Sequence, residues 1–250
     1  MHPVELDIGA LAAAAREEYV AFAQRIAVVP YERKGILFSE MFFFSLCAKM
    51  ARPQRILESG RARGQSTLLL ALCFPELEIV SVEHNRDSSD SAVAAKRLRG
   101  RENVRLVFGD ATRLLPAIAR EGDIALIDGP KGYRGLRLAI RLLASARLPL
   151  VFLHDTGAGT MERRFLQTRF PEAAYSGEIR FAEVAHSLDG ACQADIPDAH
   201  RWQGGPPAGG YGFSLACLPW RADRNYGNAM AWALWDGLAH RLRLPAAQYG

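Results

Sequence analysis

Short apolar runs alternate with segments of helical spacing from residue 54 onward, and this alternation constrains the fold most. Strands that alternate with helices predict a mostly parallel sheet with helices on both faces. The strands are expected at 54–59, 78–83, 104–108, 123–128 and 148–154, and the helices at 66–73, 88–98, 111–119, 133–144 and 161–168.

The chain before residue 54 is expected to be helical. Residues 4–29 and 36–51 show helical spacing, and Pro53 ends this region because proline stops a helix. We therefore expect an N-terminal helical extension over residues 1–53.

The alternation stops after residue 176. Residues 178–186 and 211–219 are predicted to be two late strands, separated by a long loop that ends in a Gly/Pro-rich run, and residues 226–244 are predicted to be helical. The central domain is expected to cover 54–220, with a C-terminal helix over 221–250 packed on it.

The composition is that of a folded globular protein. Of the 250 residues, 49% are hydrophobic and 23% are charged, which is too apolar for a disordered chain. The excess of basic over acidic residues, 31 against 27, is small and scattered, so we expect no nucleic-acid partner.

The cysteines and the apolar segments indicate the compartment. No Cys-x-x-Cys pair occurs, which favours reduced, buried thiols over disulfides or a zinc site. The most apolar stretch, 36–47, is interrupted by Glu40 and is too short for a bilayer, and residues 1–7 lack the basic start of a secretory signal. We expect a cytoplasmic protein without a membrane partner.

The loop after the first predicted strand carries the most specific signal. Gly60 and Gly64 allow a tight turn and a close approach of ligand to backbone, and Ser66 or Thr67 can cap the helix that follows. Glu83 ends the next strand, where an acid accepts hydrogen bonds from ribose hydroxyls. This spacing predicts an adenosine-containing ligand.

The charges of this loop favour S-adenosylmethionine over a dinucleotide. Glu58 would repel the phosphates of a dinucleotide, whereas it suits a sulfonium and an ammonium group. Arg61 and Arg63 argue in the other direction, because they could neutralise phosphates. Ala62 and Gln65 break the three-glycine fingerprint of dinucleotide sites.

Taken in order, these motifs resemble those of the class I S-adenosylmethionine-dependent methyltransferases. The series is Glu58, Gly60, Gly64, Ser66-Thr67, Glu83, Gly109-Asp110-Ala111 and Asp128. Its first part is similar to small-molecule O-methyltransferases of the catechol type and to relatives near the cephalosporin-hydroxylase family. The resemblance implies an α/β, doubly wound, Rossmann-like sheet of seven strands with a late antiparallel strand.

The same resemblance implies roles for individual residues. The loop Gly60–Gly64 would support the methionine part of the cofactor, Glu83 would hold the ribose, and Asp110 would face the adenine amino group. The expected cofactor contacts are Glu58, Gly60, Arg61, Gly64, Ser66, Thr67, Glu83, His84, Asp110, Ala111 and Asp128. Many members have glycine at the position of Ala62, and alanine is expected to fit there if φ is negative.

Two acids are expected to converge at the carboxyl ends of adjacent strands. Asp128 and Asp155 are one crossover apart, and two carboxylates there suit a divalent cation such as Mg²⁺. Metal-dependent catechol-type enzymes resemble this pattern, which implies Asp128 and Asp155 as metal ligands and Lys131 as the general base, so the catalytic residues are predicted to be Lys131 and Asp128. The next ligand in that family is usually Asn, whereas this chain has Thr156, a weaker donor.

Other interpretations of these residues remain open. Asp128 can orient substrate without a metal, Asp155 can cap a turn, and Lys131 can be an exposed loop residue. His154 is a second candidate base, although a regular strand would point its side chain away from that of Asp155.

Three functions follow from the sequence. The first is S-adenosylmethionine-dependent O-methylation of a small molecule, with the acceptor held by residues 4–51 and 187–210. The second is an NAD-dependent oxidoreductase. The third is a non-catalytic partner subunit that uses Phe42–Phe44 and Trp232/Trp235 as an interface, although these residues could equally form a homodimer or plain core. The sequence does not identify the acceptor.

Overall fold

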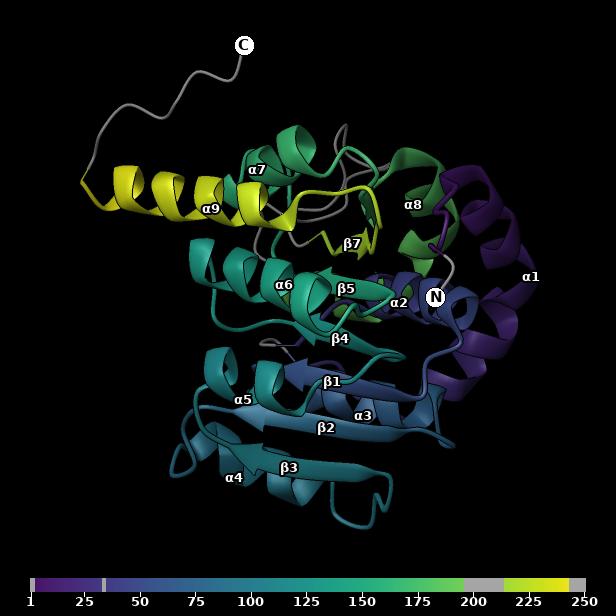
Figure 1. Ribbon diagram of the computed structural model, residues 1–250. Coiled ribbons are helices and arrows are strands. Elements are labelled where there is room, and N and C mark those ends of the chain that lie inside the picture. The colour runs from purple at the N-terminus through teal and green to yellow at the C-terminus, as the bar shows by residue number, and fades with distance from the viewer. Residues whose placement is uncertain (1–2, 33–34, 196–213, 243–250) are drawn as a thin grey trace.

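A seven-stranded sheet organises the part of the chain that the structure describes (Figure 1). The computed structural model describes residues 3–32, 35–195 and 214–242. The strand order is β3-β2-β1-β4-β5-β7-β6. The strands are β1 (Arg55–Ser59), β2 (Glu78–Glu83), β3 (Val104–Phe108), β4 (Asp123–Ile127), β5 (Leu150–Leu153), β6 (Ala174–Tyr175) and β7 (Ala216–Pro219).

Helices precede, connect and follow these strands. They are α1 (Ile8–Ile26), α2 (Phe38–Ala51), α3 (Gln65–Cys73), α4 (Ser89–Arg97), α5 (Ala111–Ile118), α6 (Tyr133–Ser145), α7 (Met161–Arg169), α8 (Ile179–Ala185), the 3₁₀ helix η1 (His186–Asp195) and α9 (Tyr226–Arg241). The five predicted strand–helix pairs are all present, with ends that differ by a few residues.

The sheet is parallel from β3 to β5 and antiparallel at its far edge. β1 lies between β2 and β4, and β7 runs antiparallel to both β5 and β6. Every residue of β1 and β4 is buried, since helices cover both faces of a parallel sheet, and this explains their continuous apolar runs. The predicted Rossmann-like sheet with a late antiparallel strand is confirmed.

Two hydrophobic cores lie on the two faces of the sheet. One joins α1, α2, α3 and α8 to the strands, and the other joins α5, α6, α7 and α9 to them (Figure 1). In the first core, Phe44 packs against Phe152 with ring centroids 4.2 Å apart. Phe42, Phe43 and Phe44 are fully buried, so they are core residues rather than an interface.

The prediction of a strand at 178–186 is wrong. Residues Ile179–Ala185 form α8, whose buried residues Phe181, Ala182 and Ala185 follow helical spacing. Phe181 and Ala185 belong to the first core, which also contains residues of α1. The sixth strand is instead the two-residue β6, immediately before this segment. Within the predicted strand 211–219, residues Ala216–Pro219 form β7, and the predicted loop begins as η1. Residues 196–213 lie outside the described residues.

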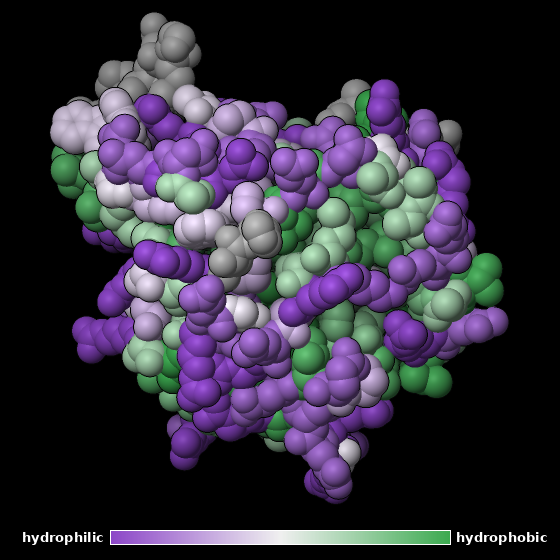
Figure 2. Space-filling view, turned by 45° about the vertical axis from the view of Figure 1, so that its right-hand side comes forward, coloured by the Kyte–Doolittle hydropathy of each residue, from purple (hydrophilic) through white to green (hydrophobic). Residues whose placement is uncertain are grey.

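The face of the molecule seen in Figure 2 is largely polar. Figure 2 shows hydrophilic residues over much of one face, with apolar residues gathered in its central part. Among the described helices, none has the length and apolar character needed to cross a membrane. On α9, Trp232 packs at the edge of the second core, whereas Trp235 is 55% exposed.

Candidate active site

A cavity of about 170 Å³ lies at the carboxyl ends of the parallel strands. This edge is where open α/β sheets bind ligands. Five of the predicted cofactor contacts line it, together with Val82, Gly109, Gly129, Pro130 and Arg134; the five are Gly60, Glu83, His84, Asp110 and Ala111.

The loop after β1 lies against the loop after β4. Gly60 has φ +82°, and a Cβ atom there would lie 2.7 Å from the backbone nitrogen of Gly129. Only glycine permits this approach, because it combines a left-handed backbone with the absence of a side chain. Gly64 also has a positive φ and occupies the N-cap of α3.

Ala62 adopts a left-handed backbone, contrary to the negative φ under which alanine was expected to fit. Its φ is +43°, and its N–H donates to Oε2 of Glu83 over 3.1 Å. The other carboxylate oxygen of Glu83 accepts from the backbone of His84 at 2.6 Å and of Asn85 at 3.3 Å. Backbone donors therefore orient the Glu83 carboxylate at the cavity wall.

Glu58 and Thr67 lie beneath the loop rather than on the cavity. Glu58 is fully buried, and its Oε2 accepts hydrogen bonds of 2.5 Å from Thr67 and Ser81. Burial raises the pKa of Glu58. The prediction that Ser66 or Thr67 caps the following helix is wrong, because Gly64 is the N-cap and the Thr67 hydroxyl is bonded to Glu58.

Both loop arginines are engaged away from the cavity. Arg61 is 2% exposed, donates to the carbonyl of Ser81 at 2.7 Å and stacks on Phe108. Arg63 forms ion pairs with Glu32 and Asp90. The sequence argument that these arginines neutralise phosphates therefore has no support in the geometry.

Asp110 combines a structural contact with a place on the cavity wall. It is the N-cap of α5, and its Oδ1 accepts from the backbone and hydroxyl of Thr112. These hydrogen bonds lower the pKa of Asp110. Arg134, on the same cavity wall, lies 3.8 Å from its Oδ2.

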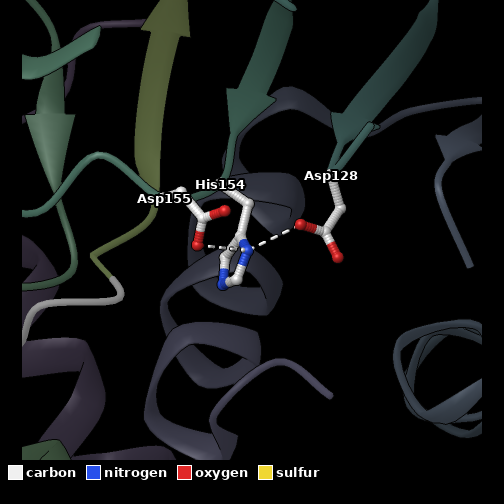
Figure 3. A group of neighbouring side chains, drawn as sticks. All are labelled: Asp128, His154 and Asp155. Atoms are coloured by element: carbon white, nitrogen blue, oxygen red, sulfur yellow. Dashed lines mark hydrogen bonds and ion pairs between the residues drawn. The ribbon is translucent and has the colours of Figure 1, made fainter. Parts of the chain in front are cut away.

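A cluster of Asp128, His154 and Asp155 lies beside the cavity, at the ends of β4 and β5 (Figure 3). Nδ1 of His154 is 2.7 Å from Oδ1 of Asp128 and 3.2 Å from Oδ1 of Asp155. Sequence alternation predicted that His154 and Asp155 point apart in a regular strand. Asp155 instead has φ +59°, which ends the extended backbone and turns its carboxylate back toward His154.

Two further charged residues complete the cluster. Lys131 forms ion pairs with Asp128 and Asp155, and Glu40 of α2 lies with its Oε2 3.1 Å from Nε2 of His154. Burial would lower the pKa of His154, but the carboxylates of Asp128 and Glu40 raise it well above its usual value. Burial would also lower the pKa of Lys131, but the charges of Asp128 and Asp155 raise it.

The donor set of the cluster fits a divalent cation. Two carboxylates and an imidazole place one ligand atom each within 4.8 Å of one another. Nitrogen and oxygen donors of this kind bind first-row divalent metals. Thr156 is not part of this set, since it is fully buried and its hydroxyl donates to the carbonyl of Ser214 over 2.7 Å.

Glu40 belongs to the site although the sequence predicts no functional role for it. In the sequence it is only the charge that interrupts the apolar stretch 36–47. That interruption is itself a signal, because a lone carboxylate among buried apolar residues requires a buried partner.

The family comparison covers the same part of the chain as the cavity. A family model described as a methyltransferase domain matches residues 57–156. This range contains the loops after β1, β2, β3 and β4, and it ends just after Asp155.

Solved structures of low sequence identity are also similar. The O-methyltransferase TomG from Streptomyces achromogenes, involved in tomaymycin synthesis and in complex with SAM, is 19% identical with a TM-score of 0.48, over 86% of this chain and 91% of that one. The SAH-bound methyltransferase PaMTH1 from Podospora anserina is 16% identical with a TM-score of 0.46, over 88% and 91%. An O-methyltransferase from Bacillus cereus in complex with SAH is 15% identical with a TM-score of 0.44, over 83% and 90%.

The matched domain and the sheet around it agree with each other. The matched residues form the cavity at the carboxyl ends of the parallel strands, and the sheet has the seven strands and the antiparallel β7 that the resemblance implied. Residues 57–156 of the chain therefore match a methyltransferase domain, which lies within a Rossmann-like sheet.

Proposed function

We propose that this protein transfers the methyl group of S-adenosylmethionine to a hydroxyl oxygen of a small molecule. One observation carries the proposal: the cavity at the strand ends and the cluster of charged side chains adjoin through the loop after β4. Gly129 and Pro130 line the cavity, and the preceding residue, Asp128, belongs to the cluster.

The cavity residues account for cofactor binding in this proposal. The Glu83 carboxylate, held by backbone N–H groups, would accept hydrogen bonds from the ribose hydroxyls. Asp110 would face the adenine. Gly60 would let the methionine part approach the backbone, while Glu58, Arg61, Ser66 and Thr67 would act indirectly by supporting the loop from below.

The reaction is a single displacement at carbon. The acceptor oxygen would attack the methyl group in line, the bond from methyl to sulfur would break, and S-adenosylhomocysteine would leave. Most of the rate acceleration would come from holding oxygen and methyl close together and aligned. The acceptor proton has to be removed during this step.

The strand-end cluster would handle that proton. Asp128, His154 and Asp155 would hold a divalent cation, which when bound supplies a Lewis acid that lowers the pKa of the acceptor hydroxyl. Lys131 is protonated while both aspartates pair with it. It would become a base once the aspartates turn to another cation, because the contacts that raise its pKa would then weaken.

Calorimetric titration with S-adenosylhomocysteine tests the cofactor assignment, with NAD as the comparison ligand. We expect binding of the former and none of the latter. Glu83→Gln should weaken binding at least tenfold, since it removes the charged acceptor for two hydroxyls, whereas the exposed surface variant Glu121→Gln should not. Binding of NAD alone would favour an oxidoreductase, and unchanged affinity in Glu83→Gln would refute the ribose assignment.

Methyl transfer itself is tested with hydroxylated acceptors, with and without added metal. Transfer of the labelled methyl group to oxygen is expected. Binding of S-adenosylhomocysteine without transfer to any acceptor would support a partner subunit instead. A measurement of the oligomeric state of the same protein sample would test the possible homodimer.

A further inference from the structure

Glu40 brings a buried charge to the cluster from outside the matched domain. It lies in the first turn of α2, is 1% exposed and is surrounded in sequence by buried apolar residues. Burying a carboxylate is strongly unfavourable unless hydrogen bonds or an opposite charge compensate for the lost hydration. His154, 3.1 Å away, provides that compensation.

Capping of the helix explains only part of this arrangement. Oε2 of Glu40 also accepts a hydrogen bond from the backbone N–H of Leu37 at 2.9 Å, which supports the start of α2. Among the described residues, Oε1 of Glu40 has no hydrogen-bond partner. A cap at the surface would not require this burial, so the contact with His154 is the feature that needs a functional explanation.

The two nitrogens of the His154 ring face different partners. Nε2 faces Glu40, whereas Nδ1 faces Asp128 and Asp155. Figure 3 shows Nδ1 joined to the two aspartates and Nε2 directed away from them. A ring that donates its Nε2–H to Glu40 can present Nδ1 as a donor atom to a metal. Histidines that bind metals usually donate their other N–H in this way.

The distances around Nδ1 agree with a shared metal site. The separations of 2.7 Å and 3.2 Å from Nδ1 to the aspartate oxygens are close to the roughly 3 Å between neighbouring ligands bound at about 2.1 Å. Lys131, the cation that now pairs with both aspartates, has a side chain that is 54% exposed, so it has room to move away.

We propose that Glu40 is a positioning residue that orients His154 as a nitrogen ligand, so that the cluster prefers Mn²⁺ or Zn²⁺ to Mg²⁺. Imidazole suits first-row transition metals, whereas Mg²⁺ prefers oxygen ligands. The inference rests on the metal site of the proposed function and extends it to the class of metal and to a residue outside the matched domain.

Metal titrations test this without reference to activity. The titrations compare four chelator-treated proteins: wild type, Glu40→Gln, Glu40→Met and the distant control Glu172→Gln. Each protein is titrated with Mn²⁺, Zn²⁺ and Mg²⁺. Pulsed electron paramagnetic resonance of the Mn²⁺ forms then shows whether a nitrogen ligand couples to the metal. Wild type and control should bind Mn²⁺ at least tenfold more tightly than Mg²⁺ and should show the coupling. Glu40→Met should lose 10- to 100-fold in Mn²⁺ affinity. Glu40→Gln should lose less, because its amide oxygen can still accept from Nε2.

Several outcomes would overturn the inference. Three results would refute His154 as a ligand. They are equal affinity of the wild type for Mn²⁺ and Mg²⁺, no binding of divalent cations, and no nitrogen coupling. Glu40 would have a purely structural role if both Glu40 variants kept the wild-type affinity for Mn²⁺. The same conclusion would follow if they lost affinity for Mn²⁺ and Mg²⁺ equally. If the protein prefers Mn²⁺ but transfers no methyl group, the proposed function is contradicted while the inference about the metal stands.

Discussion

Asp189 should make the stability of the protein fall as pH rises toward neutrality. This residue lies in η1, is fully buried and accepts a hydrogen bond of 3.1 Å from the backbone N–H of Ser39 at the start of α2. Burial raises the pKa of Asp189 from 3.8 to about 7, and the nearby charge of Glu40 adds to this rise.

The sign and size of the effect follow from proton linkage. Between pH 4 and pH 7 the folded protein keeps the proton on Asp189, while the unfolded chain has released it. The contribution is therefore fully present below the unfolded pKa and is lost as pH rises through the folded one, at about 1.4 kcal/mol per pH unit. Over three units the free energy of unfolding should fall by roughly 4 kcal/mol from this group alone.

Urea unfolding between pH 4.5 and 8 measures this in wild type and Asp189→Asn. Asparagine can still accept from Ser39 but carries no charge, so the variant should gain stability relative to wild type as pH rises. Asp223→Asn, whose side chain is 82% exposed, serves as the control and should show no such trend. A difference between wild type and Asp189→Asn that stays constant with pH would refute the reasoning.

Two further substitutions test the core and the loop. Phe44→Ala should cost about 3–5 kcal/mol in urea unfolding, because it empties a fully buried site against Phe152; a loss below 1 kcal/mol would contradict this packing. Gly60→Ala should weaken S-adenosylhomocysteine binding in calorimetry and lower the thermal midpoint, since its Cβ would meet Gly129 at 2.7 Å. The control Gly159→Ala has a similar positive φ but no atom within 4 Å of the added Cβ, so equal effects of the two would count against the clash.

Much of the fold could be predicted because local sequence carries its signal. The buried strands β1 and β4 are continuous apolar runs, and the crossovers between them have helical spacing. The prediction failed at 178–186, where a seven-residue helix is too short to show a clear period. Packing against α1, which is distant in sequence, favours the helix there.

Part of the candidate site could be predicted because its residues lie at strand ends that local sequence identifies. Gly60 and Glu83 were placed near the ligand by their positions at strand ends, and Asp110 was placed there by the family resemblance. The structure brings all three to one cavity. Other predicted contacts are buried away from the cavity. Arg61 is charged and was therefore expected to contact the ligand, but its guanidinium lies under the loop and donates hydrogen bonds to strand carbonyls.

The sequence was sufficient for the succession of strands and helices along residues 54–168 and for the acids at the strand ends, since both depend on patterns within a few dozen residues. The composition of the charged cluster was not readable in this way. The left-handed backbone of Asp155 turns its carboxylate toward His154, and α2 brings Glu40 to the same ring from 114 residues away in the chain. Contacts of this kind depend on how separate elements pack, because no local pattern records which buried charge will meet which partner.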